Sequence, residues 1–296
     1  MAERSLWKRG RDAVEGVGVW LTFKFFGLLP LDNASDFGGW LARNIGPRLG
    51  ASKRARINLH CAMPELDDTR IESIVAGMWD NLGRVVAEYP HLGEIKLYEP
   101  GGRVIIERFS EIIATRTPET RFIFFSAHFG NWEIATAAAT QAGLDVLEIY
   151  RAANNPIVDR IINRARSAIG SRLARKGSEG ARAAVEAMQD KRHICMLVDQ
   201  KMNDGIPVPF FGRDAMTAPA LARLALRYDC TVVPCRFERI EGTRFRFVAE
   251  TPLTLPRSGD LSADTLALMT AVNATVERWV RARPEQWFWL HRRWPD

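Results

Sequence analysis

Hydrophobic residues along this chain form two kinds of pattern: short continuous runs, and longer stretches with helical spacing. The short runs are typical of buried strands and lie at residues 103–106, 121–126, 145–150, 193–198, 231–237 and 244–249. Between them, helical periodicity occurs at residues 132–142, 157–169, 178–190, 217–228 and 262–283. Strands that alternate with helices indicate an α/β fold with a mostly parallel central sheet flanked by helices on both faces.

The N-terminal part of the chain has a different pattern. Residues 67–89 predict an amphipathic helix that ends at Pro90. Residues 17–31 are the most apolar stretch, but the stretch is shorter than the roughly 20 residues of a membrane span, and Lys24 interrupts it. A short or tilted membrane helix, an in-plane interfacial helix, a secretory signal and a buried helix of a soluble protein are the alternatives. The signal lacks a small-residue cleavage site.

Basic residues and tryptophans surround this apolar stretch. They are Arg4, Lys8, Arg9, Arg11, Arg43, Arg48, Lys53, Arg54 and Arg56, with Trp7, Trp20 and Trp40. Such residues around a short apolar helix are typical of a segment held at the level of lipid headgroups. We therefore expect residues 1–31 to form an N-terminal membrane anchor or interfacial helix, and residues 32–296 to form one catalytic domain.

The composition narrows the class of partner. The 296 residues are 47% hydrophobic, and 41 Lys and Arg against 35 Asp and Glu give a net charge of +6. This balance favours an anionic partner: a nucleic acid, an anionic membrane or an acidic carrier protein. No nucleic-acid-binding motif is present, so we expect no nucleic-acid partner. The four cysteines lack zinc-site spacing, which predicts reduced thiols and no structural metal.

A histidine and a glutamate follow the strand predicted at residues 121–126. The sequence Phe124-Phe-Ser-Ala-His-Phe-Gly-Asn-Trp-Glu133 places His128 at the strand end and Glu133 at the start of the next helix. A general base needs a carboxylate that fixes its tautomer and stabilises its charged form, so we predict His128 as the base and Glu133 as its partner. A turn histidine capped by a nearby acid is the alternative. The turn at Gly130 and Asn131 offers backbone N–H groups for an oxyanion.

Charged residues also follow two other predicted strands. Arg151 comes after the strand at 145–150, and Asp199 comes after the strand at 193–198. Carboxyl ends of parallel strands share one edge of a sheet, where ligands bind, so we expect both residues near substrate. A solvated loop arginine and a turn aspartate are the alternatives. A buried carboxylate needs a partner, and we expect Arg166 on the helix at 157–169 to pair with Asp199.

Three further features bear on the chemistry. No Gly-x-Ser-x-Gly motif is present, which counts against a serine hydrolase, and we expect His128 to activate a substrate hydroxyl directly. The apolar loop at 205–212 predicts a lip over an acyl chain or, alternatively, a loop folded back on the core. The aromatic and cationic residues at 287–294 predict either core packing or contact with an anionic headgroup. His291 has no carboxylate nearby in sequence, so we leave it out of the catalytic set.

Four ordered blocks of sequence resemble the bacterial lipid A late acyltransferases, the lauroyl and myristoyl transferase family. The blocks are the His128 motif, Tyr150-Arg151 with Asn154-Asn155-Pro156 and Arg166, Asp199-Gln200 with 208–212 and Thr217, and 287–294. They extend from Phe124 to the end of the chain, and the N-terminal segment is similar to the anchor of that family.

The resemblance implies a glycerolipid-acyltransferase-like fold and an O-acyltransferase at the cytoplasmic face of the bacterial inner membrane. The donor would be acyl-acyl carrier protein, which is a substrate rather than a cofactor, and the acceptor would be a hydroxyl of a lipid A precursor. His128 and Glu133 would be catalytic, while Arg151, Arg166 and Asp199 would bind substrate. No metal or other cofactor is expected.

Other functions fit some of the same residues. A lysophospholipid acyltransferase or another glycolipid acyltransferase would use a similar histidine and acid. A metal-dependent hydrolase would use His128, Glu133 and Asp199 as ligands. A membrane scaffold without catalytic activity would leave the His128 motif and the Asp199 block without a role.

Overall fold

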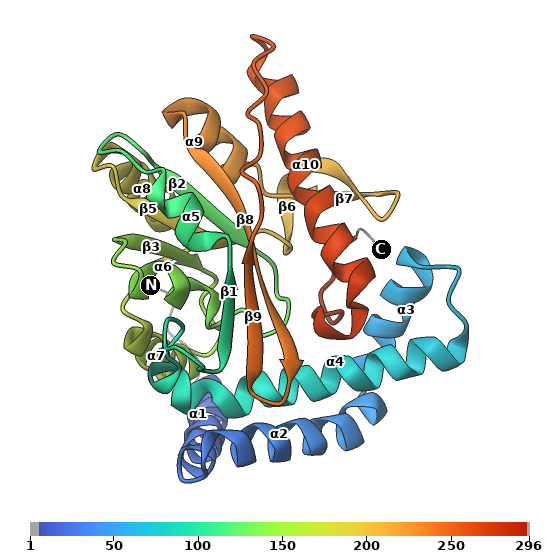
Figure 1. The fold of residues 1–296 in the computed structure, drawn as a ribbon. Coiled ribbons are helices and arrows are strands. Elements are labelled where there is room, and N and C mark those ends of the chain that lie inside the picture. The colour runs from blue at the N-terminus through green and yellow to red at the C-terminus, as the bar shows by residue number, and fades with distance from the viewer. Residues whose placement is uncertain (1–5, 295–296) are drawn as a thin grey trace.

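A seven-stranded sheet forms the centre of the computed structural model, which describes residues 6–294 (Figure 1). In sheet order its strands are β1 (Val104–Glu107), β9 (Arg244–Ala249), β8 (Thr231–Glu241), β2 (Phe122–Ser126), β5 (His193–Leu197), β3 (Val146–Tyr150) and β4 (Arg172–Arg175). All neighbours are parallel except β8 and β9, which form an antiparallel pair. The predicted α/β fold with a mostly parallel sheet is therefore confirmed.

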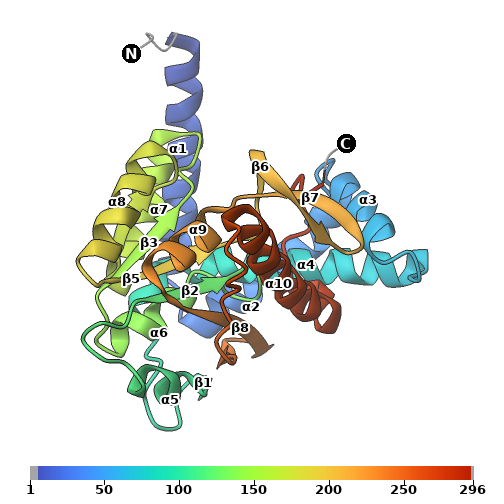
Figure 2. The same ribbon diagram turned by 90° about the horizontal axis from the view of Figure 1, so that it is seen from above.

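Helices cover the two faces of this sheet (Figure 2). Alternate residues of β2 point to opposite faces, so Phe122 and Phe124 belong to one hydrophobic cluster and Ile123 and Phe125 to the other. The first face is covered by α5 (Phe109–Ala114), α6 (Ala135–Gln141) and α7 (Pro156–Arg166). The second is covered by α8 (Ser178–Gln189), α9 (Ala220–Tyr228) and α10 (Leu261–Ala282). The central strand β2 is buried along its whole length and β5 over most of it, which explains their continuous apolar sequences.

Four helices precede the sheet: α1 (Leu6–Gly27), α2 (Leu31–Ile45), α3 (Ser52–Ala62) and α4 (Asp68–Glu88). Close packing of α2 on α4 depends on glycines, since a Cβ at Gly38 would lie 2.6 Å from the carbonyl oxygen of Gly83. The apolar stretch predicted at 17–31 is divided, because α1 ends at Gly27 and α2 begins after Pro30. No helix within residues 6–294 is long and apolar enough to cross a membrane. Residues 1–5 of the expected anchor lie outside the described residues.

Two structures were not predicted from the sequence. The edge strand β4 is short and begins and ends with arginine, so it carries little hydrophobic signal. A separate antiparallel hairpin, β6 (Lys201–Phe210) and β7 (Arg213–Thr217), contains most of the predicted lip. Val208 and Phe210 of this hairpin are buried in the core, and the Trp294 indole donates a hydrogen bond to the Phe210 carbonyl. The buried side chains of this segment thus pack on the core, as in the second of the two alternatives, whereas Pro207 and Pro209 are exposed.

Candidate active site

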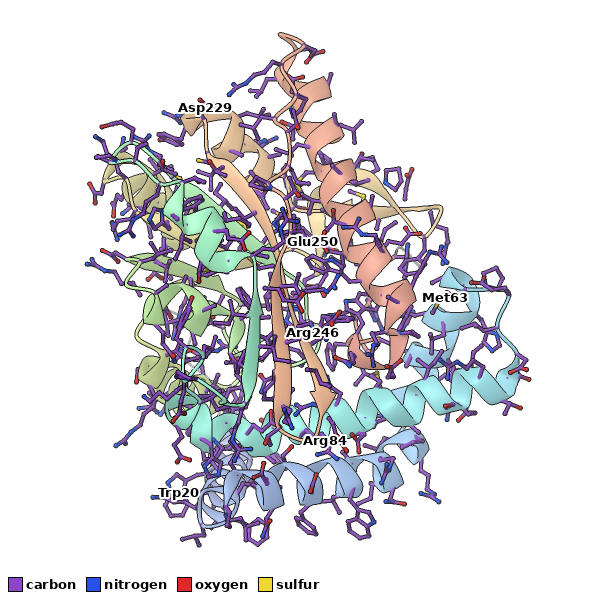
Figure 3. All side chains as sticks on the ribbon, viewed as in Figure 1. Trp20, Met63, Arg84, Asp229, Arg246 and Glu250 are labelled. Carbon is purple, nitrogen blue, oxygen red and sulfur yellow. The ribbon has the colours of Figure 1, made fainter. Side chains whose placement is uncertain are left out.

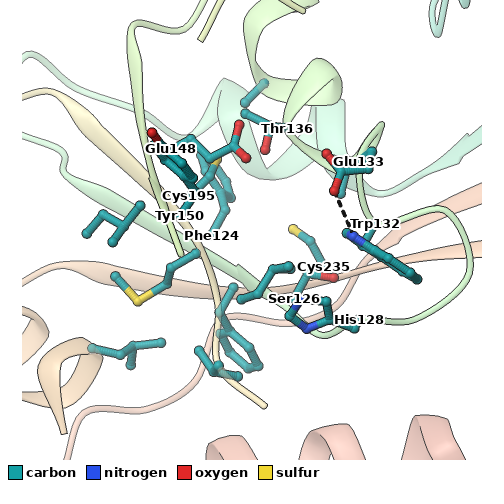
Figure 4. Close-up of a pocket in the computed structure, with 18 of the residues that line it drawn as sticks. Phe124, Ser126, His128, Trp132, Glu133, Thr136, Glu148, Tyr150, Cys195 and Cys235 are labelled. Atoms are coloured by element: carbon teal, nitrogen blue, oxygen red, sulfur yellow. Dashed lines mark hydrogen bonds between the residues drawn. The ribbon is translucent and has the colours of Figure 1, made fainter. Parts of the chain in front are cut away.

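A cavity opens at the carboxyl edge of the sheet, where β2, β5 and β3 end (Figure 4). His128, which follows β2, lines this cavity together with Ser126, Glu133, Arg151 and Arg166. The interior is largely apolar, with walls that include Phe109, Phe124, Ala139, Cys235 and Phe247. A parallel sheet brings together residues that follow different strands, and these polar groups therefore gather around one apolar recess.

His128 is hydrogen-bonded to Asp199, which follows the neighbouring strand β5. The Nδ1 atom of His128 lies 2.8 Å from Oδ1 of Asp199, and the backbone N–H of His128 donates to Oδ2, also at 2.8 Å. The indole Nε1–H of Trp287 donates a third hydrogen bond to the same carboxylate at 2.8 Å. Burial alone would raise the pKa of Asp199, but attraction to His128, the hydrogen bonds from His128 and attraction to His291 outweigh it, and the net pKa lies well below its usual range.

This contact determines which nitrogen of His128 faces substrate. An Nδ1–H that donates to Asp199 leaves Nε2 as the basic atom. The side-chain amide nitrogen of Gln200 lies 3.2 Å from Nε2, in position to donate to it. The His128 side chain is 14% exposed, whereas that of Asp199 is 1% exposed, so the base faces the cavity and its carboxylate partner is sealed behind it. The arrangement can accept a proton from a hydroxyl that replaces the Gln200 amide.

His291 also belongs to this cluster, although nothing in the sequence indicated that it should be included among the catalytic residues. Its ring lies edge-on to that of His128, with 4.9 Å between centroids, and its Nε2 is 3.8 Å from Oδ2 of Asp199. Burial and the neighbouring His128 lower the pKa of His291 to about 3, so this imidazole is neutral near pH 7. The contact could not be predicted from the sequence, because 92 positions separate His291 from Asp199 and only the fold of the C-terminal segment brings them together.

Within the described residues, one ligand atom each from His128, Asp199 and His291 lies within 4.8 Å of the others. This set could hold a metal ion, but it differs from the set considered from sequence, in which Glu133 was the third ligand. Both Asp199 oxygens already accept hydrogen bonds, so a metal would have to displace part of that network.

Glu133 does not contact His128 as predicted; it forms a buried ion pair with Arg166. The guanidinium Nε lies 2.6 Å from one carboxylate oxygen and Nη2 lies 2.7 Å from the other. The Trp132 indole also donates to this carboxylate at 2.8 Å (Figure 4). Burial raises the pKa of Glu133, but Arg166 and the hydrogen bonds more than offset it, and the net pKa is lowered. The expected pairing of Arg166 with Asp199 is therefore also wrong.

The exchange of partners has a structural reason. Residues 127–134 form an irregular turn, and α6 begins only at Ala135, so spacing along a helix does not govern where Glu133 points. The buried Asn131 holds this turn: its side-chain oxygen accepts from the backbone N–H of Glu133 and its amide donates to Glu88. The turn thus directs Glu133 toward the end of α7, where Arg166 lies, while His128 remains beside β5.

The turn does not offer the N–H at Gly130 that was expected to bind an oxyanion. That N–H donates to the backbone carbonyl of Gln286 at 3.0 Å. Gly130 adopts a φ of +57°, and an added Cβ would lie 1.7 Å from the Phe237 carbonyl oxygen. Only glycine fits this position, and its purpose is close packing of the turn against β8 and the C-terminal segment. The N–H of Gly130 is therefore not available to an oxyanion.

The sequence of this chain is similar to those of known acyltransferases. Residues 11–296 match the family of bacterial lipid A biosynthesis acyltransferases. The chain is 26% identical over 247 residues to the lipid A biosynthesis myristoyltransferase of Escherichia coli, covering 82% of this chain and 75% of the relative. It is 27% identical over 250 residues to lipid A biosynthesis acyltransferase 1 of Shigella flexneri, with the same coverage. A Haemophilus influenzae lipid A biosynthesis acyltransferase is 24% identical over 288 residues, 92% of this chain and 86% of the relative.

Proposed function

Because the chain belongs to the bacterial lipid A biosynthesis acyltransferases, we propose that it moves a fatty acyl group from acyl carrier protein to a hydroxyl of a lipid A precursor. The observation that carries this proposal is the bonded pair of His128 and Asp199 at the opening of an apolar cavity. The hydroxyl oxygen attacks the thioester carbonyl, and the thiol of the carrier protein leaves.

In this mechanism His128 Nε2 takes the proton of the attacking hydroxyl. Asp199 keeps the proton on Nδ1 and stabilises the imidazolium that forms. The proton then passes to the departing thiolate, so the base is regenerated and no covalent acyl-enzyme is needed. Glu133 acts at a distance from His128, through the guanidinium of Arg166, which it orients along the cavity wall.

Ser126 is our candidate for the donor that stabilises the tetrahedral oxyanion. It lies two residues before His128, it lines the same cavity, and it is 5% exposed. Its hydroxyl has no hydrogen-bond partner in the described part of the chain, although a buried polar group normally has one. An oxyanion would provide that partner. Ser126→Ala should lower kcat about tenfold or more with KM unchanged; equal kcat values would exclude this role.

The apolar part of the cavity is our proposed slot for the acyl chain. Phe109 packs against both Phe124 and Phe247, with ring centroids 5.3 Å and 5.2 Å apart, and the three rings line one part of the cavity. Burial of methylene groups against such a wall stabilises the bound acyl group by about 0.8 kcal/mol per CH₂. The size of side chains such as Ala139 would then limit the chain length accepted.

We also propose attachment to the cytoplasmic face of the inner membrane through α1 and α2. In support, large apolar side chains on these helices are exposed: Trp7, Val14, Val17, Trp20, Leu21, Phe25, Phe37, Trp40, Leu41 and Ile45. Trp20 lies at the outer edge of the molecule (Figure 3). Apolar burial is insensitive to salt, so high salt should leave the protein on membranes and detergent should release it. Release by salt alone would contradict interfacial insertion.

The central experiment combines purified protein, acyl carrier proteins charged with chains of different length, and a lipid A precursor, with mass spectrometry of the products. We expect an added acyl group on the precursor and a preference for one chain length. A lysophospholipid offered in parallel tests the alternative acceptor. Acylation of the lysophospholipid alone would assign the enzyme to that reaction, and retention of activity in a metal chelator would argue against the hydrolase alternative.

A further inference from the structure

Two cations stand side by side at the cavity opening. Strands β3 and β4 are parallel, with Tyr150 opposite Arg175, so Arg151 and Lys176 are the next pair of residues in register. The backbone N–H of Lys176 donates to the Tyr150 carbonyl at 2.7 Å, which continues the pairing to this point. Both side chains line the cavity that contains His128. Lys176 was not among the candidate residues identified from the sequence.

Neither cation is paired with a carboxylate among residues 6–294. The contrast with Arg175 is informative, since its guanidinium is 2.7 Å from the buried carboxylate of Asp159. Arg151 and Lys176 are both exposed, and partial desolvation together with the nearby charge of Arg151 lowers the pKa of Lys176. Two like charges that lack a counterion repel each other, and an anion between them would relieve this repulsion.

The local chain path adds to the positive potential. Gly177 connects Lys176 directly to α8, a helix of 12 residues, with a φ of +125°. The helix therefore begins at the carboxyl edge of the sheet, where its free backbone N–H groups and macrodipole favour negative charge. A strand, a short glycine-containing turn and a helix N-terminus are a common arrangement for binding phosphate.

We propose that Arg151 and Lys176 form a phosphate clamp, which holds a phosphate ester of a substrate while its reacting group lies at His128. This inference rests on the proposed function, in which two substrates carry such a group. A lipid A precursor has phosphates on its sugars, and acyl carrier protein has a phosphodiester in its prosthetic arm. The apolar acyl slot offers no group that binds a phosphate, so the clamp would position the charged part of the substrate.

The first test is steady-state kinetics of Lys176→Ala and Arg151→Ala, with each substrate varied in turn. Loss of a charge-assisted contact should raise one KM by about tenfold or more, with a smaller change in kcat. The matched control is Arg172→Ala, which removes an exposed arginine at the opposite end of β4 that is paired with Asp145. Lys176→Arg should retain most of the wild-type KM, because it keeps the charge.

The two substrates separate the sources of the phosphate. A raised KM for the lipid, which disappears when the lipid is dephosphorylated, assigns the clamp to the acceptor. A raised KM for acyl-acyl carrier protein alone assigns it to the prosthetic arm. Values within twofold of wild type for both substrates, in both alanine variants, would overturn the proposal.

A binding measurement tests phosphate binding by the clamp without relying on acyl transfer. Calorimetric titration of the wild-type protein with inorganic pyrophosphate should show binding that weakens about tenfold or more in Lys176→Ala and not in Arg172→Ala. If wild-type protein transfers no acyl group but this difference is present, the proposed function fails, whereas phosphate binding at Lys176 stands. Equal binding by all three proteins would overturn the clamp even if acyl transfer occurs.

Discussion

Two acid–base pairs border the same cavity, and they differ in whether an atom of the pair is free to exchange a proton with substrate. In the pair of His128 and Asp199, one imidazole nitrogen is bound and the other faces the cavity, so the pair can exchange a proton with substrate. In the pair of Glu133 and Arg166, the carboxylate binds the guanidinium through both oxygens and is 2% exposed. The first arrangement is suited to proton transfer, and the second to a fixed electrostatic wall.

The difference shows that the residues of a motif need not act on one another. His128 and Glu133 are five positions apart, yet each has its partner on another element: one just after β5 and one at the end of α7. Asp199 would be an unpaired buried charge without His128, and Arg166 would be one without Glu133. Each pair therefore has its own stability cost if broken.

Removal of the base should have the largest effect. His128→Ala is expected to lower kcat about 10²–10⁴-fold while the protein remains folded, because the hydroxyl then attacks without a proton acceptor. Single-turnover kinetics and circular dichroism measure the two properties. A folded variant with near wild-type kcat would show that the first pair does not perform proton transfer.

Asp199→Asn should have the next largest effect, because it retains shape but removes the charge that stabilises the imidazolium. We expect a loss in kcat of about 10²-fold and a weaker preference for the Nδ1–H tautomer. Nitrogen-15 chemical shifts of the His128 ring report the tautomer directly. Unchanged shifts would mean that other contacts, such as that with Gln200, determine it.

Double-mutant cycles test whether the pairs are separate. The cycle of Glu133→Gln and Arg166→Met should show a coupling free energy of about 1–3 kcal/mol in unfolding experiments. The cross-pair cycle of Arg166→Met and Asp199→Asn should be additive to within about 0.5 kcal/mol. Strong coupling across the pairs would mean that the cavity contains one network rather than two.

The pH dependence of the free energy of unfolding should also distinguish the cluster around His128 from the pair of Glu133 and Arg166, although the effect is smaller. The pKa of His291 falls from its ordinary 6.5 to about 3 on folding, so stability is greatest above pH 6.5 and decreases as the pH falls toward 3. The pKa of Glu133 is lowered from 4.5, so its contribution decreases only below about pH 4.5. Each proton contributes a slope of at most about 1.4 kcal/mol per pH unit.

Urea unfolding between pH 7 and pH 4 measures this difference. His291→Phe should flatten the dependence above pH 5, whereas Glu133→Gln should change it only near the acid end. The same pH dependence in wild type and His291→Phe would show that the neutral imidazole does not contribute.

The sequence by itself predicted six of the seven strands of the central sheet and the edge at which the site lies. Continuous apolar runs such as 121–126 predict strands buried on both faces, and His128, Arg151 and Asp199 follow such runs directly. Parallel strands bring their carboxyl ends to one edge of the sheet, so these residues were expected at the same edge. The sequence blocks that resemble the lipid A acyltransferases are also short and local, so the family could be recognised without knowledge of the fold.

Only the tertiary structure decided which side chains pair. Strand order placed β5 beside β2, which brought Asp199 to His128. The turn held by Gly130 and Asn131 directed Glu133 to α7, and the C-terminal segment brought His291 and Trp287 to Asp199 from 92 and 88 positions away. Periodicity reports which face of an element is buried, but it carries no information on contacts between distant elements. Those contacts depend on strand order, turn geometry and packing, which only the folded chain defines.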